Sequence, residues 1–413
     1  MRTRPWCLAF VSALALALGP LGGILAPSAA AQAWHASSAA ARVVRRAVRA
    51  TAAPGRGTFF ATVTPSPFIH VGARAWIVVQ TPADWAKAAF RVTLGGNASA
   101  FRLSPPTATQ RRHGVVALVA AVAGPAKATV AVSVEGRPRR LVLPLESFAH
   151  PDQLVAGKGA WIAFDTYGAM TATALLGRMR REGVTHVYLE TGGDRFTERA
   201  QLGALLEPAH NLGIAVVAFA WAPLGQLRRE IHSAGETITY RAPHGGMVDG
   251  FAGDFEKNLA RPAVREYSAA VRHDLGPSRV YVACIYAPQL GFRTPIATLA
   301  RYVNVFAPMD YWLGRRWPFA TARAFGFVRT SVWDLRHARG EGGRAIEVIA
   351  QTADVANQSG FGALNPSAAQ VRASARAARA AGALGVSFYE LLTQTAAQVA
   401  AIATFQMPWK PTL

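Results

Sequence analysis

Residues 248–256 have the sequence Val-Asp-Gly-Phe-Ala-Gly-Asp-Phe-Glu, an apolar run that ends in two carboxylates spaced i, i+2. Because side chains on a strand alternate between its faces, this spacing predicts a buried strand that projects Asp254 and Glu256 to one side. Two neighbouring carboxylates rarely both ionise at neutral pH, since like charges raise the pKa of one of them. A carboxyl group kept protonated in this way can act as a general acid, so the pair marks a candidate active site.

The chain on either side of this strand, from residue 158 to 408, alternates apolar strands with Ala- and Arg-rich amphipathic helices. Near-continuous apolar strands are typical of a parallel sheet covered by helices. Eight strand–helix units within about 250 residues match a (β/α)8 TIM barrel, an α/β fold. The predicted strands are 160–165, 185–190, 215–221, 248–256, 279–286, 302–311, 345–351 and 385–390, and the predicted helices include 171–182, 198–212, 262–275, 367–381 and a closing helix 393–405.

Polar and aromatic residues gather where these strands end, on the face at which barrels of this type carry their active sites. Aromatic rings pack on the apolar faces of sugar rings, and carboxylates bind hydroxyl groups or act as acids. The set predicts a saccharide-binding mouth, whereas the alternative for any single position is a strand end that merely reaches solvent. In chain order the candidate residues are Asp165, Tyr167, Glu190, Trp221, Asp254, Glu256, Tyr286, Asp310, Tyr311, Trp312, Gln351, Tyr389 and Glu390.

Residues 249–256 resemble the strand-four signature Asp-Gly-x-Asp-x-Asp-x-Glu of family 18 glycoside hydrolases, the chitinases and their relatives. The matching positions are Asp249, Gly250, Asp254 and Glu256. The stretch Met309-Asp310-Tyr311 is similar to the Met-x-Tyr of that family's sixth strand. The resemblance implies that Glu256 protonates the glycosidic oxygen and that Asp254 orients the substrate's N-acetyl group, whose oxygen is the nucleophile. It also implies that Tyr311 holds that group.

The chain departs from the family pattern at three places. The middle Asp is Ala252, the Asp after the sixth-strand Tyr is Trp312, and the eighth-strand Trp is Phe388 or Tyr389. A retaining mechanism that uses a second carboxylate of the protein would place it about 5 Å away on another strand. Strand seven ends in Gln351, so the choice stays open between a substrate-assisted route and Glu390 or Asp165 as the second carboxylate.

Three segments precede the barrel. Residues 1–33 have a positive start, an apolar middle and a small-residue end, the order of a cleaved secretory signal peptide. Residues 34–57 are rich in Ala and Arg with little apolar periodicity, which predicts a disordered or weakly helical basic linker. Between residues 58 and 150, short runs of β-branched and aromatic residues alternate with turns. This pattern predicts an immunoglobulin-like β-sandwich with an accessory role.

The charge and the cysteine content indicate which partners and which cellular compartment the protein favours. The formal charge of +21 favours an anionic cell-envelope polymer as a partner, and no nucleic-acid-binding signature is present. The mature chain would contain one cysteine, Cys284, so a secreted protein of this sequence relies on its core rather than on disulfides. After the signal peptide no run of about twenty apolar residues predicts a membrane span. No cofactor and no metal site is predicted.

These features predict a secreted or cell-envelope-associated glycoside hydrolase that acts on an envelope or extracellular polysaccharide. One alternative is a catalytically inactive barrel that binds glycan, motivated by Ala252 and Trp312. Another is an envelope-associated binding protein in which the linker and the β-domain are the functional parts. Two further expectations concern the barrel: residues 222–247 form a long connection that walls the mouth, and His210 lies exposed on a helix.

Overall fold

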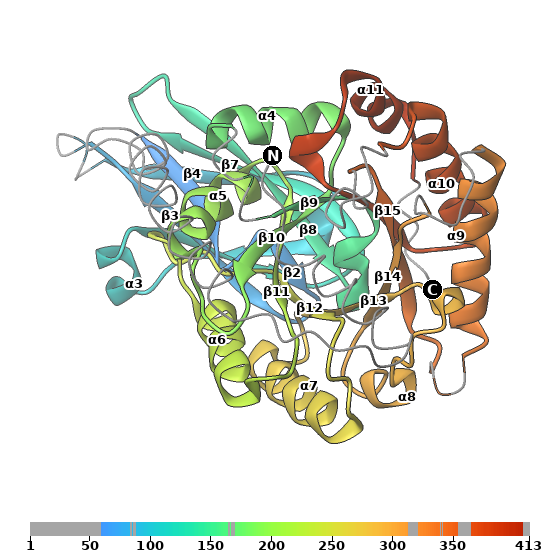
Figure 1. Cartoon of the computed structure of the whole chain (residues 1–413). Coiled ribbons are helices and arrows are strands. Elements are labelled where there is room, and N and C mark those ends of the chain that lie inside the picture. Colours follow the sequence, from blue (N-terminus) through green and yellow to red (C-terminus); the bar gives the residue numbers. More distant parts are fainter. Residues whose placement is uncertain are drawn as a thin grey trace.

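The computed structural model describes residues 59–82, 85, 88–163, 166, 170–312, 321–338, 340, 342–353 and 365–407. The predicted signal peptide (1–33) and basic linker (34–57) lie outside this part of the chain, and both stay predictions. Figure 1 shows a barrel surrounded by helices, with the N-terminal strands (blue to cyan) packed against one side of it.

The barrel is a closed sheet of parallel strands in the order β10-β11-β12-β13-β14-β15-β16-β9, and pairs such as Gly385 with Gly157 close the ring. Each predicted strand falls on one of these strands, so the predicted α/β TIM barrel is confirmed. Their bounds in chain order are β9 Gly157–Ile162, β10 His186–Gly192, β11 Ala215–Trp221, β12 Gly250–Phe255, β13 Val280–Tyr286, β14 Val305–Asp310, β15 Ala345–Gln351 and β16 Gly385–Tyr389.

The alternation of side chains along each strand produces two separate cores. On β12, Phe251 and Phe255 point outward and pack against the helices, where the Phe255 ring meets Tyr267 edge-on at 5.8 Å. Ala252 points inward and belongs to the cluster that fills the barrel. Asp254 and Glu256 continue this inward series, so the strand delivers both carboxyl groups to the interior at its carboxyl end.

The helices surround the barrel (Figure 1). They bury their apolar faces against the outward side chains of the strands. The helix α6 lies inside the connection that the sequence predicts to be a long loop, and Glu230 in its first turn accepts bonds from the backbone of Leu224 and Gln226. Residues 227–239 of the predicted loop are therefore helical, and the role of this connection as a wall of the mouth stays a prediction. The helices are α4 Ala172–Glu182, α5 Arg199–Asn211, α6 Leu227–Thr239, α7 Arg261–Leu275, α8 Ile296–Leu299, α9 Thr321–Arg336, α10 Ala368–Ala380 and α11 Ala396–Thr404.

The N-terminal region contains two four-stranded sheets, of order β1-β3-β6-β5 and β2-β8-β7-β4, which share one hydrophobic cluster. The immunoglobulin-like assignment of this region and its domain boundaries stay predictions. The strands are β1 Phe60–Thr64, β2 Phe68–His70, β3 Arg74–Gln80, β4 Phe90–Gly96, β5 Phe101–Ser104, β6 Val115–Ala121, β7 Ala126–Val134 and β8 Arg140–Phe148, and a short helix α3, Ala108–Arg112, precedes β6.

Asp249, directly before β12, joins this region to the barrel. One of its carboxylate oxygens accepts the Ser66 hydroxyl, and the other lies 2.9 Å from His210 Nε2 and 2.7 Å from the amide nitrogen of Val216. His210 is completely buried, which corrects the expectation that it is exposed. The reason is that the N-terminal strands cover this part of α5, as the bond from Asn211 to the carbonyl of Ala61 also shows.

A second buried polar network lies inside the barrel below the mouth. His186 Nε2 lies 2.8 Å from Glu347 Oε1, and the hydroxyl of Tyr188 donates to the other oxygen of Glu347. Trp161 stacks on Tyr188 with ring centroids 3.9 Å apart. The network thus fixes Tyr188, and Tyr188 in turn supports an indole ring at the level of the mouth.

Across the residues that the structure describes, none of the helices combines the length and the apolar character that a membrane crossing requires.

Candidate active site

The candidate site is built on the carboxyl end of β12. Asp254 is only 8% exposed, and Glu256, two residues further, is half-buried. The sheet register places Asp254 beside Trp221 on β11 and beside Cys284 on β13. Both carboxyl groups therefore lie among inward side chains of neighbouring strands, as the i, i+2 spacing predicts.

The electrostatics of the pair favour the protonated forms. Burial raises the pKa of Asp254 well above its usual value, and the nearby charges of Glu256 and Glu190 raise it further. Burial also raises the pKa of Glu256 to about 7, although Lys257 and Trp221 act in the opposite direction because they favour the ionised carboxylate. Glu256 can therefore hold a proton at near-neutral pH and release it over a small pH range, as a general acid must.

Aromatic side chains surround the pair. Tyr311 follows β14 and faces inward, where Asp254 and Glu256 add to the burial that raises the pKa of its hydroxyl. Its ring lies 5.7 Å from that of Tyr389, and Tyr389 lies 6.4 Å from Trp161. Trp161, Tyr389 and Tyr311 thus form a row of aromatic rings that reaches the two carboxyl groups at Tyr311.

Several buried polar atoms at this site have no hydrogen-bond partner among the described residues. They are one oxygen of Asp254 (Oδ1), one oxygen of Glu256 (Oε2) and the indole nitrogen of Trp161. A buried polar group without a partner costs about 1–3 kcal/mol, so such groups are expected to bind something. Two oxygens and one N–H donor next to aromatic rings fit the hydroxyl and amide groups of a saccharide.

Other candidates from the sequence also lie inward. Glu190 on β10 is buried and close enough to Asp254 to raise its pKa. Tyr286 ends β13 and stacks on Phe292 at 4.0 Å. Gln351 is completely buried, and its amide donates to the carbonyl of Ala353. The structure therefore brings Glu190, Trp221, Tyr286, Gln351 and Tyr389 to the same end of the barrel interior as the acid pair.

Glu390 is buried in a different way. Its carboxylate accepts the hydroxyl of Thr166 and lies 3.4 Å from the amide nitrogen of Ala163. These bonds hold the carboxylate against the chain that follows β9, so Glu390 stabilises that connection. The structure thus gives Glu390 a bonding role that the sequence does not reveal.

Asp310 and Trp312 are not brought to the mouth. Both flank Tyr311, and alternation sends them to the outer side of the sheet: Asp310 is fully buried with Ser331 of α9 as its neighbour, and Trp312 packs in the core beneath the helices. Asp165 and Tyr167 lie outside the described residues.

The sequence analysis missed three residues of the mouth. Trp161 sits on β9 before the strand end, Phe219 lies 4.8 Å from it, and Lys257 Nζ lies 5.4 Å from the ring of Trp221. Side chains on β9 and β11 alternate between the inner and outer faces of the barrel, and this alternation identifies Trp161 and Phe219 as inward-facing. Lys257 follows Glu256 directly, and only the structure shows that its amine turns back toward Trp221.

No group of three or more His, Cys, Asp or Glu side chains within the described part of the chain is arranged to hold a metal ion. The two cavities of about 610 Å³ that described residues line lie away from the acid pair, one beside the N-terminal sheets and one beside α7 and α8.

No protein-family model and no curated protein matches this chain. Similar solved structures include glycoside hydrolases. A candidate alpha-galactosidase/melibiase from Bacteroides fragilis NCTC 9343 is 10% identical with a TM-score of 0.47, covering 87% of this chain and 79% of its own. A family 39 glycoside hydrolase from Bacteroides cellulosilyticus WH2 is 11% identical with a TM-score of 0.40 (83% and 82%). A class V chitinase from Pseudomonas fluorescens Pf-5 is 13% identical with a TM-score of 0.42 (60% and 98%).

Proposed function

We propose that this protein is a glycoside hydrolase of polysaccharides, with Glu256 as its general acid. One observation carries the proposal: Asp254 on β12 and Glu256 directly after this strand follow the same inward alternation, and the pKa of Glu256 is raised to about 7. The half-buried rings of Tyr311 and Tyr389 near the pair would pack on sugar faces. The experiment is the release of new reducing ends from a polysaccharide panel by the wild-type protein, and its loss in Glu256→Gln.

The proposed mechanism is substrate-assisted. Among the described residues, Gln351 occupies the end of the seventh strand, and the Glu390 carboxylate is engaged by Thr166 and Ala163. In this route the N-acetyl oxygen of the substrate attacks the anomeric carbon while Glu256 protonates the departing oxygen. Asp254 would orient the acetamido group and Tyr311 would donate a hydrogen bond to it, the roles that the resemblance to family 18 implies.

Tyr311→Phe is expected to lower kcat on an N-acetylated polymer by about tenfold to a hundredfold, because one donor to the acetamido group is lost. Measuring kcat on the N-acetylated polymer checks the role, with Tyr302→Phe, in the turn before β14, as the matched control. The wild-type protein should not turn over the fully deacetylated form of that polymer, because it lacks the oxygen that attacks the anomeric carbon. Equal wild-type turnover of the two forms would contradict substrate assistance.

The activity should fall as pH rises through about 7, because Glu256 has a pKa of about 7 and must carry a proton to act as an acid. Lys257 lowers that pKa. Lys257→Met is therefore expected to raise it and to move the alkaline limb of kcat/KM to higher pH. A pH profile checks this, with Lys127→Met in the N-terminal sheets as the control. A limb that stays in place or moves down would show that Glu256 is not the titrating acid.

The second candidate is a barrel that binds glycan without cleaving it. Ala252 favours it, because this position is an acid in the family 18 signature and is here a buried methyl group in the barrel interior. Saturable sugar binding with no reducing-end release after long incubation would support this candidate against hydrolysis.

The proposed location is outside the cell or in its envelope, and the proposed additional partner is an anionic envelope polymer. The signal-like residues 1–33 and the charge of +21 support these two proposals. Deleting residues 34–57 should release the protein from an anionic polymer if the basic linker is responsible, and retention at high salt would exclude that role.

A further inference from the structure

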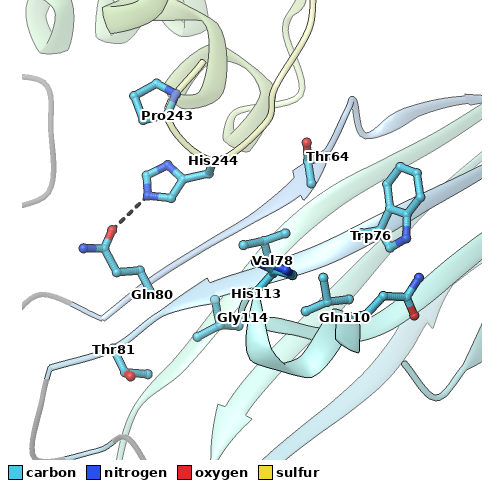
Figure 2. A pocket seen from close by; sticks show the side chains of 12 residues that line it. Thr64, Trp76, Val78, Gln80, Thr81, Gln110, His113, Gly114, Pro243 and His244 are labelled. Carbon is cyan, nitrogen blue, oxygen red and sulfur yellow. Dashed lines mark hydrogen bonds between the residues drawn. The ribbon is translucent and has the colours of Figure 1, made fainter. Parts of the chain in front are cut away.

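A cavity of about 610 Å³ lies between the N-terminal sheets and the barrel, and we call it the seam cavity. Its floor is the outer face of β3, and its rim is formed by α3 with the turn after it and by the loop before β12 that carries His244 (Figure 2). Pockets of about 300–1,000 Å³ are the usual size for small-ligand sites. The seam cavity is thus large enough for a ligand, and it is separate from the acid pair of the barrel.

The floor offers an aromatic and apolar surface. Along β3, Ala75, Ile77 and Val79 point into the core of the N-terminal sheets, while Trp76 and Val78 point outward and are half-buried. Both outward residues line the seam cavity. Their exposed apolar area can pack against the C–H face of a sugar ring, as indole rings do in saccharide sites.

The rim offers amides and imidazoles in fixed orientations. Glu207 on α5 accepts from the backbone N–H of His244 at 2.8 Å and lies 2.7 Å from its Nδ1. The other ring nitrogen of His244 lies 2.8 Å from Gln80 Oε1, the bond drawn in Figure 2. This chain of contacts spans the two parts of the molecule. It holds the Gln80 amide and the His244 ring together on one side of the rim.

The opposite side of the rim is similar. Gln110 uses its amide oxygen to accept the Thr107 backbone N–H at 2.8 Å, which leaves its amide nitrogen as a donor. His113 follows at the end of α3 and is exposed. Donors and acceptors of the rim therefore come both from α3 with the turn after it and from the loop that carries His244.

The charge of the lining decides the class of ligand. The 12 residues that line the seam cavity include no Asp, Glu, Lys or Arg, although the protein as a whole carries a formal charge of +21. The lining has no Arg or Lys to pair with a phosphate, a sulfate or a uronic acid, and of its two imidazoles that of His244 already faces Glu207 and Gln80. An aromatic floor with amide and imidazole donors matches a ligand that combines apolar ring faces with many hydroxyl groups.

We propose that the seam cavity binds a neutral oligosaccharide, such as a segment of a polysaccharide chain. This site goes beyond the activity proposed for the barrel, and its ligand class follows from its own lining. A protein with two saccharide sites would hold a polymer at the seam while the barrel acts on another segment, so the N-terminal sheets would contribute directly to recognition.

The test is isothermal titration calorimetry with the full chain carrying Glu256→Gln, which prevents turnover. The neutral probes are cellohexaose, chitohexaose and mannohexaose, and hexagalacturonate is the anionic probe. Trp76→Ala and His113→Ala are each added to this background. Arg74→Ala is the matched control, because Arg74 lies two residues before Trp76 on the same face of β3 and outside the cavity.

We expect at least one neutral hexasaccharide to bind, and Trp76→Ala and His113→Ala each to weaken that binding by about tenfold, while Arg74→Ala leaves it unchanged. Should Trp76→Ala not fold, as judged by thermal unfolding, His113→Ala decides, because its side chain is exposed. The proposal is overturned if no neutral probe binds, if binding ignores the cavity variants, or if they affect only hexagalacturonate. Reducing-end release with Glu256 intact tests the barrel separately.

Discussion

Replacing Glu256 with Gln is expected to lower kcat at least about a hundredfold, and up to about ten-thousandfold, which is the range that positioned acids and bases contribute. Gln is nearly isosteric with protonated Glu and keeps a polar group in the half-buried position, so the fold should be unaffected. It cannot give a proton to the departing glycosidic oxygen. The measurement is reducing-end release from the best responding polysaccharide, followed as kcat and KM for both proteins.

The matched control for this prediction is Glu266→Gln, an exposed acid on α7 that faces away from the barrel interior. It should leave kcat unchanged. The result that contradicts the proposed acid is a Glu256→Gln protein with wild-type turnover and an unchanged melting temperature. In that case another group must protonate the leaving oxygen.

Replacing Asp249 with Ala is expected to lower the free energy of unfolding by about 2–6 kcal/mol, because each buried donor that loses its acceptor costs about 1–3 kcal/mol. The substitution leaves the Val216 amide and the Nε2 of His210 without an acceptor, and both are completely buried. It also removes the acceptor of the Ser66 hydroxyl. Urea unfolding of the full chain is the measurement.

Asp274→Ala is the control for Asp249. Asp274 also contacts a histidine, His273, but the His273 side chain is exposed and that of Asp274 is half-buried, so the loss of this pair should cost less than about 1 kcal/mol. A similar small loss for Asp249→Ala would show that the junction between the N-terminal sheets and the barrel contributes little. The comparison separates the first acid of the motif, which we assign to stability, from Glu256, which we assign to chemistry.

The barrel could be predicted because each of its strands is a near-continuous apolar run bounded by polar residues. Two strands, β11 and β15, match the predicted ranges 215–221 and 345–351 to the residue. In the N-terminal region, β2 and β5 could not be predicted from the sequence. They have three and four residues, which are too few to show the alternation of apolar and polar residues that is typical of a strand. The helix α6 could have been found, since Leu227, Ile231, Ala234 and Ile238 recur at helical spacing.

The candidate site could be predicted in part for the same reason. Strand parity correctly places Asp254 and Glu256 on one face, and the same parity, applied to Tyr311, sends its two neighbours outward. Asp310 and Trp312 were grouped with it by position in the chain alone. The burial of His210 could not be predicted, because it depends on strands that lie about 150 residues earlier and dock on α5 only in the folded molecule.

The Asp249 junction makes modular exchange of this barrel difficult. Asp249 immediately precedes β12, and the proposed general acid, Glu256, immediately follows it. Only the six residues of this strand therefore separate the two. A barrel excised from its N-terminal neighbour would lose the Ser66 hydroxyl and admit water to the Asp249–His210 pair. Grafting the barrel onto another partner would therefore disturb the foot of its reactive strand, unless the new neighbour presents a hydroxyl at the same point.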